Sequence, residues 1–150
     1  MLQKDLREFI ELLNSEGVRY VIVGGYAVAF HGHPRVTGDI DVFVDATATN
    51  SSKMERVVRA FGFPGPGLSA ADFAKRDKIV QLGLPPNRVD IITSIDAVTF
   101  DEAWSTRVEA TLDDVRVNYI SKELLLKNKA ATGRAGDAAD IERMQRDDDS

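Results

Sequence analysis

The feature that most constrains the fold is an uninterrupted apolar run, Tyr20–Val23, that ends in Gly24 and Gly25. Four adjacent apolar residues in an extended segment point to both faces of a sheet, so both faces must be covered. In a chain of 150 residues, one sheet with helices packed on it meets this demand around a single core. The run therefore predicts a central strand of an α/β domain.

The rest of the pattern predicts helices and strands that alternate early and form hairpins later. Helical spacing marks 2–13, with Gly17 as the stop, and Ser52 and Glu55 have the spacing of a capping box. Further helices are expected over 26–31, 52–61, 122–131 and 137–146 and around Trp104, and strands over 37–45, 78–84, 88–94, 108–112 and 115–120. We expect a mixed central sheet flanked by helices, in one domain over 1–146, with an acidic, disordered tail over 147–150.

The composition excludes several classes of protein. The sequence has no cysteine, which rules out disulfides, zinc–cysteine sites and a thiol nucleophile, and fits a cytoplasmic location. No stretch reaches the roughly 18 apolar residues of a membrane span. The net charge of −5 argues against a broad nucleic-acid-binding surface, but a small nucleotide can be neutralised locally by metal ions and a few basic side chains.

Two aspartates with a spacing of two, Asp39 and Asp41, lie in the second expected strand. Residues i and i+2 of a strand project from the same face, so these carboxylates are expected side by side. Like charges so placed repel unless a cation lies between them. Mg²⁺ typically binds one or two carboxylates together with substrate phosphates, so the pair predicts half of a magnesium site.

Gly24 and Gly25 lie where the apolar strand enters a helix. Backbone N–H groups there are not covered by side chains, and a phosphate can approach them closely. A third carboxylate, Asp90, lies in a strand pattern where a charge is otherwise out of place. It is a candidate to complete a two-metal site or to act as the general base.

These residues resemble the core signature of the nucleotidyltransferase superfamily that shares the DNA polymerase β-type palm. The resemblance rests on the glycine pair followed by Arg35-x-Thr37-x-Asp39-Ile40-Asp41-Val42. It is closer to small bacterial members, including nucleotidyltransferase-like toxins of abortive-infection systems, and a weaker match continues over 129–140.

The resemblance implies transfer of a nucleoside monophosphate from a nucleoside triphosphate to a hydroxyl, with Mg²⁺, or Mn²⁺ in its place. The implied catalytic and metal-binding residues are Asp39, Asp41 and Asp90, and the implied nucleotide-binding residues are Gly24, Gly25, Arg35, Thr37 and Lys129. One departure concerns Gly25, because the motif usually has serine there and this chain lacks the hydroxyl.

Plainer interpretations stay open beside these. Asp90 alone fits an exposed aspartate on a half-buried strand, Arg35 and Thr37 fit loop residues, and Lys129 fits a solvated helix face. The alternative to an enzyme is a weak or inactive nucleotide-binding or partner-binding module of the same fold. The acceptor is open between RNA, protein and a small molecule, and a homodimer or a protein partner is equally open.

Overall fold

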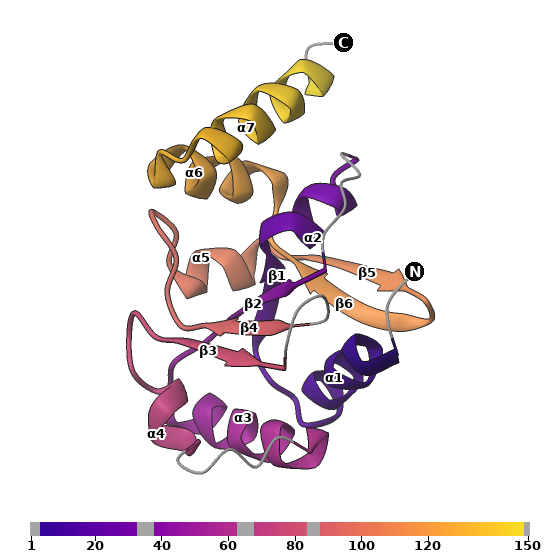
Figure 1. Cartoon of the computed structure of the whole chain (residues 1–150), viewed down its shortest axis with the longest axis vertical. Helices are drawn as coiled ribbons and strands as arrows, with labels where there is room; N and C mark the ends of the chain where they lie inside the picture. The colour runs from indigo at the N-terminus through magenta and orange to yellow at the C-terminus, as the bar shows by residue number, and fades with distance from the viewer. Residues whose placement is uncertain (1–3, 33–37, 63–67, 84–87, 149–150) are drawn as a thin grey trace.

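A computed structural model describes residues 4–32, 38–62, 68–83 and 88–148, which form one six-stranded sheet with helices packed on it (Figure 1). The strand order is β3-β4-β2-β1-β6-β5. The strands are β1 (Tyr20–Val23), β2 (Ile40–Val44), β3 (Ile79–Leu82), β4 (Val89–Ile92), β5 (Val108–Leu112) and β6 (Val115–Tyr119). The mixed α/β sheet expected from the sequence is confirmed.

Strand β1 is central, as its apolar run predicts, and all four of its residues are buried. It pairs antiparallel with β2 and parallel with β6, while β4 runs parallel to β2. Strands β5 and β6 form the expected hairpin. Asp113 and Asp114 at its turn have φ of 51° and 66°, the left-handed conformation that two-residue hairpin turns need and that aspartate tolerates.

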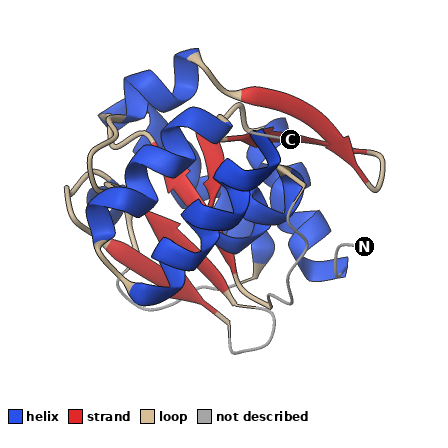
Figure 2. Cartoon of the chain, turned by 90° about the horizontal axis from the view of Figure 1, so that it is seen from above, coloured by secondary structure: helices blue, strands red, loops and turns tan. Residues whose placement is uncertain are grey.

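The helices gather in groups around the sheet. Helix α1 (Lys4–Ser15) packs against α3 (Ala48–Phe61), next to the short α4 (Ala70–Phe73), at the lower side of Figure 1. Helix α2 (Gly24–Phe30) packs on β1 and β2, and α5 (Phe100–Ser105) contacts β1. Helices α6 (Lys122–Thr132) and α7 (Ala135–Asp148) pair at the opposite end. The view from above shows helices lying over the strands (Figure 2).

Several helices differ from the sequence-based expectations. The capping box at Ser52 was wrong, because α3 begins one turn earlier, where the Thr47 hydroxyl accepts a hydrogen bond from the Asn50 N–H at 3.4 Å. The Ser52 hydroxyl instead donates to the carbonyl of Ala48 inside the helix. Helix α4 is a single turn, too short for periodicity to reveal. Helix α7 continues to Asp148, two residues past the expected domain end.

Candidate active site

Gly24 lies at the end of β1 in a conformation and a space that only glycine fits. Its φ is +67°, and a Cβ built on it would lie 2.1 Å from Oδ2 of Asp41. Helix α2 starts at this glycine, and the residue before it, Val23, offers no side-chain cap. The N–H groups in the first turn of a helix lack intrahelical partners, so this turn is suited to accept an anion.

The sheet register brings two of the expected aspartates next to this glycine. Asp41 on β2 is the partner of Val23 on β1 and also of Asp90 on β4. The third aspartate, Asp39, comes one residue before β2 begins. Asp39 and Asp41 were expected in the same strand, but only Asp41 lies in β2. The parallel pairing of β2 with β4 therefore puts two carboxylates side by side, with the third close by.

The ionisation of Asp41 reflects this crowding. Several causes together raise the pKa of Asp41 from 3.8 to about 6, and burial is the largest of them. The charge of Asp90, a hydrogen bond with Asp90 and the charge of Asp39 act in the same direction, while the charge of Arg88 opposes them. A carboxylate with such a raised pKa among other carboxylates is a recurrent property of functional sites.

Arg88, which the sequence analysis did not single out, partly neutralises these carboxylates. Its Nε and Nη2 donate to the two oxygens of Asp90 at 2.7 and 3.1 Å, and Nη2 also lies 3.2 Å from Oδ2 of Asp39. The hydrogen bond to Asp90 is also the main reason why the pKa of Arg88 is raised. The spacing of two between Arg88 and Asp90 in an extended segment is the signal that could have revealed this contact.

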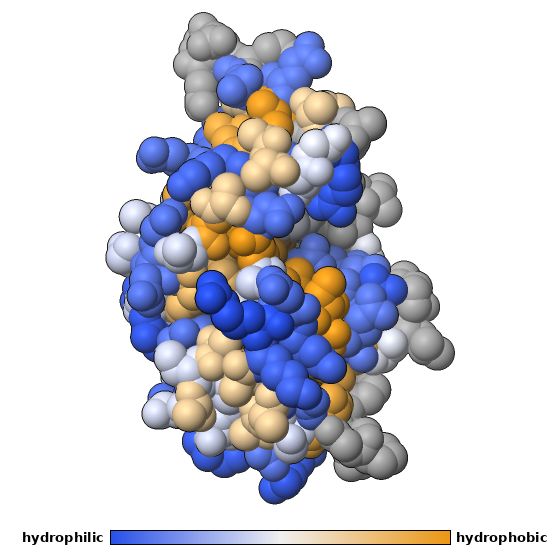
Figure 3. All heavy atoms as spheres, turned by 90° about the vertical axis from the view of Figure 1, so that its left-hand side faces the viewer, coloured by the Kyte–Doolittle hydropathy of each residue, from blue (hydrophilic) through white to orange (hydrophobic). Residues whose placement is uncertain are grey.

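The carboxylates open into a cavity of about 500 Å³ between the sheet and α6. Its lining combines carboxylates of the sheet, basic and polar groups of α6 and of the segment that follows it, and the apolar surface of several isoleucines. The residues that line it include Gly24, Asp41, Asp90, Ile79, Lys129 and Arg134. Ile79 on the edge strand β3 is 59% exposed, the most exposed large hydrophobic residue among those described. Figure 3 shows one face of the molecule, where apolar patches alternate with hydrophilic surface.

Lys129 is buried, so the interpretation as a solvated helix face was wrong. The residue is only 6% exposed and lines the cavity, and its Nζ lies 3.1 Å from Oδ2 of the buried Asp140 on α7. Helix periodicity could not reveal this, because the partner lies on the next helix. The ion pair joins α6 to α7 beside the cavity and holds the ammonium group in place.

The expected site residues therefore fall into three groups. Gly24, Asp41, Asp90 and Lys129 line one cavity, with Asp39 and Gly25 adjoining it. Arg35 and Thr37 lie outside the described residues. Within the described ranges, no three histidine, aspartate or glutamate side chains are grouped so that they could hold a metal ion. Two adjacent carboxylates still suit Mg²⁺ when a phosphate supplies further oxygens.

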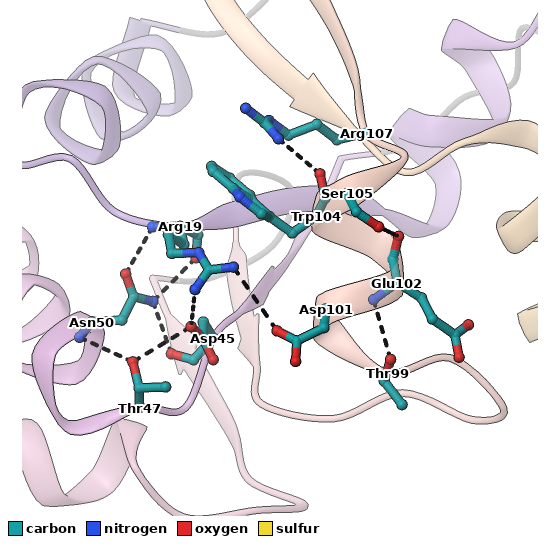
Figure 4. A network of polar contacts seen from close by, with 10 residues as sticks. All are labelled: Arg19, Asp45, Thr47, Asn50, Thr99, Asp101, Glu102, Trp104, Ser105 and Arg107. Carbon is teal, nitrogen blue, oxygen red and sulfur yellow. Dashed lines mark hydrogen bonds and ion pairs between the residues drawn. The ribbon is translucent and has the colours of Figure 1, made fainter.

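A second arginine–aspartate arrangement lies at the other end of β2 (Figure 4). Arg19 donates through Nη1 to Oδ2 of the buried Asp45 at 3.1 Å, and its guanidinium lies over the ring of Trp104. The Asn50 side chain accepts from the main-chain N–H of Arg19 at 2.7 Å and donates to the main-chain carbonyls of Arg19 and Asp45. These contacts connect β1, β2 and α3 and use protein partners throughout.

Several solved structures share this fold. LnuA, a lincosamide antibiotic adenylyltransferase bound to lincomycin, is 19% identical, with a TM-score of 0.58, over 97% of this chain and 97% of that chain. ANT(2")-Ia in complex with adenylyl-2"-tobramycin is 13% identical, with a TM-score of 0.57, over 93% and 84%. A Thermotoga maritima protein described provisionally as a nucleotidyltransferase is 17% identical, with a TM-score of 0.58, over 95% and 91%. At these identities the likeness shows the fold alone.

Sequence comparison identifies the family. No curated protein matches the sequence at a significant level. None of the helices in the described part of the chain has the length and apolar character needed to cross a bilayer.

The resemblance to the nucleotidyltransferase superfamily, expected from the glycine pair and the aspartates, is confirmed. Over residues 2–149 the sequence matches the family described as nucleotidyl transferases of unknown function (DUF2204), and the chain belongs to that family.

Proposed function

We propose that this protein is a metal-dependent nucleotidyltransferase that transfers a nucleoside monophosphate from a nucleoside triphosphate to a hydroxyl of an acceptor. One observation carries the proposal: the positive-φ Gly24 leaves no room for a side chain beside Asp41, which lies next to Asp90 at a cavity. A glycine in that place lets a ligand phosphate approach both the backbone and the carboxylates.

In the proposed site, Asp41 and Asp90 hold Mg²⁺ or Mn²⁺ with help from Asp39, and the N–H groups at Gly24 and Gly25 bind phosphate oxygens. A bound divalent ion would neutralise charge on the triphosphate. Lys129 and the undescribed Arg35 and Thr37 are proposed to bind the nucleotide. The acceptor oxygen forms a bond to the α-phosphorus, the bond to the pyrophosphate oxygen breaks, and the hydroxyl proton passes to a general base. Asp90 is our candidate for this base in the alternative in which Asp39 and Asp41 hold the metal without it.

The acceptor belongs to the proposal as a class, a molecule with a free hydroxyl. Two structural neighbours bear the names of antibiotic adenylyltransferases or contain an adenylylated antibiotic, which favours testing small molecules. The resemblance to abortive-infection toxins favours testing RNA and protein as well. A panel of lincomycin, tobramycin, total RNA and total protein covers these classes.

The test is transfer of label from each of four nucleoside triphosphates, labelled at the α-phosphate, to this panel in Mg²⁺ or Mn²⁺. We expect transfer by the wild type and a decrease of about a thousandfold in Asp41→Asn, because a metal ligand and several kcal/mol of charge stabilisation are lost. Asp114→Asn in the β5–β6 turn is the matched control and should keep full activity, since asparagine tolerates its positive φ. Equal transfer by Asp41→Asn and the wild type would contradict the proposal.

A second candidate, a nucleotide-binding module without turnover, is favoured by the Arg88 contacts, which already occupy Asp39 and Asp90. Thermal unfolding with each triphosphate distinguishes the two candidates. A ligand at a hundredfold excess over Kd stabilises the native state by about 2.7 kcal/mol. Stabilisation by a nucleotide with no transfer of label to any acceptor would support the module.

A further inference from the structure

Arg88 is fixed between the two segments that carry the carboxylates. It directly precedes β4, and its main-chain carbonyl accepts a hydrogen bond from the N–H of Ile40 at 3.0 Å, which holds it beside the start of β2. The guanidinium then spans both segments, with Nε and Nη2 on the two oxygens of Asp90 and Nη2 on Asp39. The planar fork of arginine matches a carboxylate in this two-point geometry.

These contacts are partly shielded from solvent. The exposed fraction of the side chain is 26% for Arg88, 12% for Asp90 and 33% for Asp39. Attraction between such charges is screened less than at an open surface. The guanidinium therefore competes strongly with any other cation for the same oxygens, and its positive charge also repels a divalent ion bound between Asp41 and Asp90.

We propose that Arg88 acts as a counter-ion that competes with a divalent metal ion for Asp39 and Asp90, so that the site without nucleotide binds metal weakly. The inference rests on the proposed function only in taking these aspartates as the metal site. Arg88 holds the carboxylates together in the metal-free protein, and its contacts must be given up, in whole or in part, before both oxygens of Asp90 can serve a metal.

The test measures Mn²⁺ binding to the full chain without nucleotide, by electron paramagnetic resonance of free Mn²⁺. Arg88→Gln removes the positive charge and should bind Mn²⁺ at least about tenfold more tightly than the wild type. Arg88→Lys keeps the charge but loses the two-point contact, so its affinity should lie between the two. Arg19→Gln is the matched control, an arginine paired with the other aspartate of β2, and should leave Mn²⁺ affinity unchanged.

A second readout follows the folded state directly. Without metal, Arg88→Gln should unfold at a lower temperature than the wild type, because the carboxylates have lost their counter-ion. Added Mn²⁺ should then raise the unfolding temperature of Arg88→Gln by more than that of the wild type. If Arg88→Gln does not fold, Arg88→Lys decides the question.

Mn²⁺ affinity no tighter than that of the wild type, in whichever of these variants folds, overturns the inference. Label transfer to the acceptor panel is measured on the same preparations, so that the two proposals fail separately. Tighter Mn²⁺ binding without transfer by any protein would leave the role of Arg88 standing and remove the proposed function. Transfer by the wild type without tighter Mn²⁺ binding in the variants would do the reverse.

Discussion

The two ends of strand β2 each carry an aspartate beside an arginine, but they satisfy these charges differently. At one end, Asp45 is 7% exposed and receives hydrogen bonds from Arg19 and Thr47, while Asn50 joins both backbones (Figure 4). At the other end, Arg88 serves two carboxylates at once, and the pKa of Asp41 is raised to about 6 by burial and by its acidic neighbours.

The same contrast appears in the two helices that begin near these ends. Helix α3 is capped by the Thr47 hydroxyl, whereas α2 begins after Val23 with no side-chain cap. At the Asp45 end of β2, which we call the closed end, the polar groups bond one another and stabilise the fold. At the Asp41 end, which we call the open end, carboxylates that repel one another and backbone N–H groups without a side-chain cap lie at a cavity. A bound cation would reduce the repulsion, and a bound anion would accept hydrogen bonds from the N–H groups. A metal–nucleotide complex brings both charges, which is why the proposed function belongs to this end.

The largest effect on stability is expected at the closed end, in Asn50→Ala. Asn50 is 2% exposed, and truncation leaves the Arg19 N–H and the Asp45 carbonyl without their side-chain partner, so the free energy of unfolding should fall by about 3 kcal/mol. Urea unfolding measures this, and label transfer by the folded variant should stay within about twofold of the wild type. Ser52→Ala, an exposed position of the same helix, is the control and should change stability by less than about 0.5 kcal/mol. A loss of transfer larger than the loss of folded protein would mean that the two ends are coupled.

An intermediate effect of opposite sign is expected at the open end, in metal-free Asp41→Asn. Because the pKa of Asp41 is raised above 3.8 to about 6 in the folded state, the native protein binds more protons than the unfolded chain in this range. The contribution of Asp41 to stability is therefore complete near pH 4 and is lost as the pH rises through 6. Asparagine cannot ionise, so at pH 7 the variant should be more stable than the wild type by about 1–2 kcal/mol, allowing for partial solvent screening.

The measurement is urea unfolding of the wild type and Asp41→Asn at steps from pH 4 to pH 7, in the presence of a chelator. The difference in unfolding free energy should be small near pH 4 and grow until about pH 6.5. Added Mg²⁺ with nucleotide should stabilise the wild type and not the variant. A difference that stays constant with pH would show that Asp41 is not crowded in the way that its neighbours indicate.

The contrast between the ends also explains how much the sequence could predict. Strand β1 agrees with the expected bounds because its four residues are apolar and end at Gly24, so local pattern and tertiary burial favour the same structure. The spacing of two between Asp39 and Asp41 indicated that these carboxylates lie together, and Asp90 stood out as a charge in an otherwise apolar strand pattern. Local signals were enough where the chain itself sets the geometry.

The parts that sequence could not predict depend on contacts between distant segments. The pairing of Asp41 with Asp90 requires the parallel register of β2 with β4, and the burial of Lys129 requires Asp140 from α7. The start of α3 was missed because it depends on the buried Asn50 of its first turn, whose side chain bonds the backbones of Arg19 and Asp45 outside the helix. Ser52 and Glu55 have the spacing of a capping box but lie inside the helix. Arg88 had a local signal, but its contact with Asp39 joins two strand ends 49 positions apart.

The smallest expected effect concerns Gly25, where the resemblance to nucleotidyltransferases leads one to expect serine. Gly25 lies inside α2 without the positive φ of Gly24, so its backbone accepts a side chain. A hydroxyl there adds a donor beside the uncapped turn. Gly25→Ser should tighten triphosphate binding about fivefold, the worth of one hydrogen bond of about 1 kcal/mol.

Titration calorimetry with Mg²⁺ and each triphosphate measures this change. Gly24→Ser is the contrasting variant and should lose binding, because its Cβ would overlap Oδ2 of Asp41 at 2.1 Å. Tighter triphosphate binding by Gly25→Ser and weaker binding by Gly24→Ser would show that a hydrogen-bond donor added at the open end of β2 can reach a phosphate. The closed end at Asp45 offers no such site, because its polar groups bond one another. Equal affinity of Gly25→Ser and the wild type would mean that the backbone N–H groups already supply the hydrogen bonds that the phosphate accepts. The absence of a hydroxyl at position 25 would then not weaken triphosphate binding.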